Sequence, residues 1–124
     1  MASFLITSIA LVKRYWIFLT LFLLTVITTL SLVPLKELPP TPSSDKVNHI
    51  IAYGALMFPV AIKKPQRWQV IALLLIGWSG AIELLQPYIN RYGEWQDLLA
   101  NIAGIVFGWL LAELLTKFSS EDFH

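Results

Sequence analysis

The chain has 124 residues, of which 56% are hydrophobic and 14% are charged. Soluble domains typically have roughly 45–50% apolar and about 25% charged residues. This shift indicates one compact membrane-associated unit rather than a soluble domain. The absence of cysteine excludes disulfides and thiolate metal sites, and the net charge of +1 is too small to indicate nucleic-acid binding.

The first 33 residues contain two apolar segments separated by Lys13 and Arg14. Residues 1–14 are too few to cross a bilayer, which takes about 20 helical residues. They are predicted to be cytoplasmic or interfacial, or to extend the following helix. Residues 15–33 carry no charge and are predicted to form the first transmembrane span. A cleaved signal peptide is the alternative, but its apolar run is usually roughly 7–15 residues and is followed by an A-x-A site.

Residues 34–47 include four prolines and are predicted to form an extended external loop, because proline cannot continue a helix. Residues 45–115 form the predicted core, with three further spans at about 47–62, 68–86 and 97–115. Residues 116–124 are predicted to be a cytoplasmic tail. The expected fold class is therefore all-α, as an integral membrane four-helix bundle.

The basic residues indicate how the four spans are oriented. Short cytoplasmic loops concentrate lysine and arginine. In a four-span arrangement, six basic residues fall on one side, namely Lys13, Arg14, Lys63, Lys64, Arg67 and Lys117. Three fall on the other side, namely Lys36, Lys46 and Arg91. Both termini are therefore predicted to be cytoplasmic, with the loops 34–47 and 87–97 outside.

Polar side chains cluster at three predicted helix ends on the outer side. The candidates for binding a ligand or building a site are Asp45, Lys46, His49, Tyr53, Glu83, Gln86, Arg91, Asp97 and Asn101. Many recur at spacings of three or four residues, which place them on shared helix faces, as in Asp45, His49 and Tyr53. Glu83 lies about 5 Å deeper than Gln86, where a carboxylate costs a few kcal/mol unless it is paired or hydrated. His49, Lys46 or Arg91 could pair with it.

Several candidates also have an ordinary structural explanation. Lys46 and Arg91 could simply extend toward lipid phosphates. Asp97 could simply cap a helix, and Asn101 could hydrogen-bond a neighbouring helix. Glu83 and His49 are harder to explain in this way. Both lie within apolar runs, where ionisable groups usually mark functional sites.

Small residues recur every four positions along the last predicted span. They are Ala100, Gly104, Gly108 and Ala112. This spacing places them on one helix face, where another helix can approach closely. Packing within the chain is the favoured interpretation, and a homodimer face is the alternative.

The residue types at the candidate site leave several chemistries open. Aspartate, histidine and glutamate can serve as acid–base groups or as oxygen and nitrogen metal ligands. No H-E-x-x-H, G-x-S-x-G or P-loop motif identifies a reaction. A hydrated cluster containing Lys46, His49 and Arg91 would equally suit a phosphate-bearing headgroup or a carboxylate. Enzymatic activity and a metal therefore stay open, and no cofactor is predicted.

Three blocks of sequence carry a resemblance to a known family. They read D-K-V-N-H-I-I-A-Y-G-A-L at 45–56, I-E-L-L-Q at 82–86, and R-Y-G-E-W-Q-D-L-L-A-N-I-A-G-I-V-F-G at 91–108. In residue types and spacing they resemble the VanZ-like family of small bacterial membrane proteins. All nine candidate site residues, with Gly104 and Gly108, fall on the family pattern. Asn90 departs from it, because the family often has glycine before the arginine.

The resemblance implies a multi-pass protein of the bacterial inner (plasma) membrane. The family's namesake is associated with low-level resistance to teicoplanin, a lipid-bearing glycopeptide antibiotic that acts at the cell envelope. We therefore expect a protein that binds or modulates an amphiphilic envelope ligand, such as a lipid-linked precursor or a lipoglycopeptide. The alternatives are an intramembrane enzyme acting on a lipid headgroup and a purely structural role for the polar residues. The oligomeric state stays open.

Overall fold

The computed structural model describes residues 2–33, 45–86 and 95–121. Within these ranges the chain is all-helical, with five α-helices and no strands. The helices are α1 (Ala2–Arg14), α2 (Trp16–Ser31), α3 (Asp45–Lys63), α4 (Trp68–Leu85) and α5 (Trp95–Glu121). The all-α class predicted from the sequence is therefore confirmed for the described residues.

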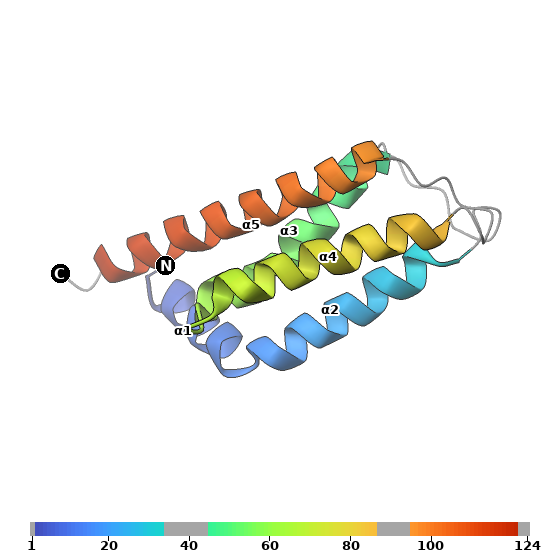
Figure 1. Ribbon diagram of the computed structural model, residues 1–124. Coiled ribbons are helices and arrows are strands. Elements are labelled where there is room, and N and C mark those ends of the chain that lie inside the picture. The colour runs from blue at the N-terminus through green and yellow to red at the C-terminus, as the bar shows by residue number, and fades with distance from the viewer. Residues whose placement is uncertain (1, 34–44, 87–94, 122–124) are drawn as a thin grey trace.

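Helices α2, α3, α4 and α5 run lengthwise, and α1 lies across one end of them (Figure 1). The bend between α1 and α2 is 75°. The end of α2, the start of α3, the end of α4 and the start of α5 gather at the opposite end (Figure 1). Polar residues at these four helix termini are thereby brought to one end of the molecule, called the site end below.

The turn between α3 and α4 lies away from the site end (Figure 1). Lys64 adopts a left-handed backbone with φ of 50°. Its N–H donates to the carbonyl of Val60 over 2.7 Å. A left-handed residue directly after a helix satisfies a terminal carbonyl in this way, and a following proline such as Pro65 cannot continue the helix.

Helix α3 is the central helix, in contact with each of the other four. Its side chains Leu56, Met57 and Val60 are fully buried. All five helices also expose large apolar side chains, such as Phe18 on α2 and Ile51 on α3. Many apolar side chains facing outward around the core suit a lipid environment better than water.

The backbones of α3 and α5 approach closely where glycines meet. A Cβ added at Gly104 would lie 2.5 Å from the Ile50 carbonyl oxygen, and one at Gly108 would overlap the Gly54 carbonyl. On the same α5 stripe, Ala100 and Ala112 are buried. Small residues permit such close approach of two helices. The stripe predicted on the last span therefore lies against α3 of the same chain.

Two helices are individually long and apolar enough to cross a membrane, over Trp68–Leu85 and Gln96–Ser119. The bent pair α1 and α2 meets the same criterion when it is taken as one broken span. Helix α3 is not among these candidates, because the polar residues at its start lower its mean hydropathy. The four-span membrane bundle with cytoplasmic termini consequently stays a prediction.

Candidate functional site

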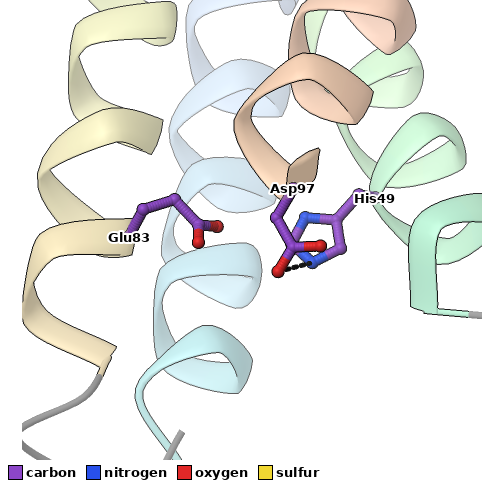
Figure 2. Close-up of side chains that lie close together, drawn as sticks. All are labelled: His49, Glu83 and Asp97. Atoms are coloured by element: carbon purple, nitrogen blue, oxygen red, sulfur yellow. Dashed lines mark ion pairs between the residues drawn. The ribbon is translucent and has the colours of Figure 1, made fainter. Parts of the chain in front are cut away.

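The site end brings together side chains from three helices. Lys46 and His49 lie in the first turns of α3, and Glu83 lies in the last turn of α4. Asp97 and Asn101 lie in the first turns of α5. Figure 2 shows the carboxylates of Glu83 and Asp97 and the imidazole of His49 pointing toward one another. A site is thus assembled from segments that are far apart in the sequence.

Lys46 and Asp97 form an ion pair between α3 and α5, with Lys46 Nζ 2.6 Å from Asp97 Oδ1. The Asp97 side chain is only 4% exposed, whereas Lys46 is 41% exposed. The pair therefore neutralises a buried carboxylate with an ammonium group that still reaches the surface. Helix α5 begins at Trp95, so Asp97 lies within the first turn, where the helix dipole also favours a negative charge.

His49 is held by α5 through its Nδ1 atom, which lies 2.7 Å from Asn101 Oδ1. Because that oxygen can only accept, Nδ1 carries the hydrogen in this arrangement. The other ring nitrogen, Nε2, lies 3.9 Å from Asp97 Oδ2. That separation is too long for a hydrogen bond, so it is an electrostatic contact that depends on the charge of the ring.

Glu83 faces the same point from the other side. One carboxylate oxygen from Glu83, one from Asp97 and one ring nitrogen of His49 all lie within 4.8 Å of one another. Tyr53, one turn further along α3 from His49, is 2% exposed. The site is therefore most polar at the helix ends and closes toward the buried core.

Gln86 lies in a different contact from the ionisable groups. Its Nε2 donates to the carbonyl of Ser31 at the end of α2 over 3.1 Å. Its Oε1 is buried and has no hydrogen-bond partner among the described residues. Gln86 thus joins α4 to α2. This supports a role in positioning the α4 terminus that carries Glu83.

Two predicted site residues are not among the described side chains. Arg91 lies outside the described residues, and Asp45 is described only as the first backbone position of α3. The described charged side chains of the site are Lys46, Glu83 and Asp97. With neutral imidazole, Lys46 contributes +1, while Glu83 and Asp97 contribute −1 each, which gives a net charge of −1.

Sequence reasoning overlooked a second polar contact, which lies away from the site end. Lys64 forms an ion pair with Glu113 over 3.0 Å and lies 5.9 Å from the centre of the Trp68 ring. Trp68 in turn stacks on Trp109. The available signal was Glu113 itself, a carboxylate within the apolar run of the last predicted span. Both partners are substantially exposed, so this pair resembles an ordinary surface ion pair.

An apolar cavity of about 540 Å³ lies among α1, α2, α3 and α5. Its lining includes Leu19, Leu23, Ile50, Phe58 and Phe107. Ile50 directly follows His49 in the sequence. The cavity is large enough for part of an apolar chain and contains little polar surface for anything else.

Chemically, the described side chains of the site offer two carboxylates, one imidazole, one ammonium group and one amide within a partly buried space. Carboxylates and imidazole can transfer protons at suitable distances, and they are common ligands for divalent cations. The ammonium group can bind an anionic oxygen only in competition with Asp97. Direct anion binding is therefore less well supported by these side chains than proton transfer or cation binding.

These features define an all-helical protein with helices suited to a membrane and a polar cluster at one end. A family model described as VanZ/LLP1 matches residues 3–116, nearly the whole chain, and the chain belongs to this family. The family membership predicted from the sequence motifs is thus confirmed. Searches of curated proteins and of solved structures found no match to the chain.

Proposed function

We propose that this VanZ/LLP1 family protein is a multi-pass protein of the bacterial inner membrane, with the site end outside and both termini in the cytoplasm. The distribution of basic residues supports this orientation. Lys63, Lys64 and Arg67 lie at the α3–α4 turn, away from the site end. Basic residues in short loops favour the cytoplasmic side.

The absence of cysteine makes this orientation directly testable. Single-cysteine variants Ser44→Cys and Gln66→Cys would be treated in intact spheroplasts with a membrane-impermeant maleimide. We expect labelling of the cysteine at 44 and none at 66 until the membrane is permeabilised. The reverse pattern would place the site end in the cytoplasm and refute the proposed orientation.

At its site end, the protein binds the polar head of an amphiphilic cell-envelope ligand, either a lipid-linked precursor or a lipoglycopeptide. One observation carries this proposal. Three helices with apolar outer faces bring His49, Glu83 and Asp97 within 4.8 Å of one another. Ionisable groups in such helices are costly and usually mark a functional site. The apolar cavity, whose lining includes Ile50 next to His49 in the sequence, supports an amphiphilic ligand over a purely polar one.

Ligand binding would be measured on purified protein in detergent, using native mass spectrometry with a polyprenyl diphosphate and, separately, with teicoplanin. The variants His49→Ala and Glu83→Gln should weaken binding at least tenfold. Glu113→Gln is the matched control, because it removes an equivalent carboxylate from the pair with Lys64 away from the site. Equal binding by all four proteins, or no binding of either ligand by the wild type, would refute the proposal.

A second candidate function is an intramembrane enzyme that acts on a lipid headgroup. The same geometry favours it, because His49 and the two carboxylates lie close enough for proton transfer to a common point. It predicts that the purified protein converts a lipid diphosphate to a new product over time, detected by chromatography. Bound ligand recovered unchanged after prolonged incubation would exclude turnover of that substrate and leave the binding function.

A further inference from the structure

The three side chains His49, Glu83 and Asp97 present one nitrogen and two carboxylate oxygens to a common point (Figure 2). We propose that they bind a divalent metal cation of the Mn²⁺ or Zn²⁺ class, and that this cation contacts the anionic headgroup. The second half of this inference rests on the proposed function. The cation site itself does not.

The orientation of His49 suits a metal ligand. Its Nδ1–H donates to Asn101 Oδ1 over 2.7 Å, so in the neutral ring the lone pair is on Nε2. Nε2 is the atom that faces Asp97 Oδ2. Two electron-rich atoms facing each other repel unless a proton or a metal cation lies between them. Metal-bound histidines characteristically donate their other ring N–H to an oxygen, as His49 does here.

The distances suit a cation after small side-chain movements. Zinc lies about 2.0–2.2 Å from nitrogen and oxygen ligands, so neighbouring ligand atoms around it are roughly 3–3.5 Å apart. Nε2 of His49 and Oδ2 of Asp97 are 3.9 Å apart, and the atoms of all three residues lie within 4.8 Å. Shifts of about 1 Å at the ends of these side chains would complete the site, well within rotamer freedom for Glu83.

The surrounding contacts also hold the ligands in place. Asn101 fixes the ring of His49, and Lys46 binds Oδ1 of Asp97, while Nε2 of His49 is nearest to Oδ2. Oxygen and nitrogen ligands in this mixture suit Mn²⁺ or Zn²⁺, since soft thiolate ligands are absent. Three protein ligands leave at least one coordination position for a phosphate oxygen or water.

The charge of the site gives the cation a role in ligand binding. The described side chains carry a net charge of −1, which repels an anionic headgroup. A divalent cation changes this sum to +1. Without the cation, the two carboxylates repel phosphate. With the cation bound between them, the site carries a positive charge that attracts phosphate.

Metal binding would be measured on the full chain in detergent, with any affinity tag removed and bound metals stripped by a chelator. Electron paramagnetic resonance would follow the loss of the free Mn²⁺ signal during titration, and a competing dye would report Zn²⁺. We expect one saturable site per chain. Asn101→Ala should weaken it by about 10–100-fold, as expected when the hydrogen-bond partner of a metal-bound histidine is removed.

The ligand variants His49→Ala and Glu83→Gln should lose the site, while Glu113→Gln should retain it. Thermal unfolding supplies a second readout, because a cation that binds only the folded state raises its stability. Saturating Mn²⁺ should raise the Tm of the wild type and of Glu113→Gln, and leave that of Glu83→Gln unchanged. No saturable binding, or binding that both ligand variants retain, would overturn the proposed cation site.

A second experiment tests the role of the cation independently of the proposed function. It measures binding of the protein to phosphatidylcholine vesicles that contain a polyprenyl diphosphate, with Mn²⁺ or Zn²⁺ and with chelator. Lipid binding that needs Mn²⁺ or Zn²⁺ would support the whole inference. If inorganic diphosphate binds more weakly than the polyprenyl diphosphate, the ligand of the site is the lipid rather than the free anion. Lipid binding that persists in chelator would overturn the cation's role and leave the proposed function standing. Cation binding without any lipid binding would refute the proposed function and leave the cation site standing.

Discussion

Replacing Gly104 by alanine tests the close packing on which the site geometry depends. The new Cβ would lie 2.5 Å from the Ile50 carbonyl oxygen and 3.1 Å from the Gly54 nitrogen. Ordinary contact begins at 3.4 Å, so α3 and α5 must separate locally by about 0.9 Å, the difference between 3.4 and 2.5 Å. Both neighbours are backbone atoms, which cannot rotate away as a side chain could.

The expected loss of stability follows from two opposing effects. Overpacking against rigid neighbours costs typically about 1–3 kcal/mol, and the contact with backbone favours the upper value. Alanine is better than glycine within a helix by about 1 kcal/mol. The free energy of unfolding should therefore fall by about 2 kcal/mol. The same separation would lengthen the His49–Asn101 hydrogen bond from 2.7 Å to about 3.6 Å, beyond hydrogen-bonding distance.

Equilibrium unfolding in detergent, followed by tryptophan fluorescence, would measure this change. Gly77→Ala is the matched control, because a Cβ at Gly77 would meet nothing within 4 Å. The free energy of unfolding of Gly77→Ala should equal that of the wild type or exceed it by up to about 1 kcal/mol. If Gly104→Ala were as stable as Gly77→Ala, the close contact between α3 and α5 would be wrong.

Two further substitutions probe the ion pair and the cavity. Lys46→Ala leaves the buried Asp97 carboxylate without its ammonium group and should lower the free energy of unfolding by about 1–3 kcal/mol, whereas Lys64→Ala should cost less than about 1 kcal/mol. Equal losses in denaturant unfolding would contradict this difference. Ala55→Phe should fill part of the apolar cavity and weaken polyprenyl diphosphate binding several-fold, with Ala81→Phe on exposed α4 surface as its control. Unchanged lipid binding by both variants would show that the lipid does not occupy the cavity.

Much of the fold could be predicted from the order of apolar and polar residues. Uncharged runs of suitable length indicated helices, and Pro65 marked the end of one of them. The bend between α1 and α2 could not be predicted in this way, because Lys13 and Arg14 interrupt the apolar run without showing whether the helix continues or bends there. Nor did the hydropathy of residues 47–62 show that α3 would become the helix in contact with each of the other four.

The candidate residues at the site were also available from sequence, because ionisable groups within apolar runs are conspicuous. Their partners were not. From the sequence, His49, Lys46 or Arg91 could pair with Glu83. The structure places Glu83 beside His49, and it adds two contacts that spacing did not indicate, Lys46 with Asp97 and His49 with Asn101. Gln86 contacts the end of α2, a partner that no helical spacing could indicate.

By itself, the sequence determined which segments are helical, which family the chain belongs to and which side chains are candidates for chemistry. These properties follow from local composition and spacing along one helix. Only the tertiary structure decided which atoms meet. The contacts at His49 depend on the rotation and offset of α3 against α5, which are set where Gly104 and Gly108 meet the backbone of α3. A distance between helices arises from packing of the whole fold, so no single segment encodes it.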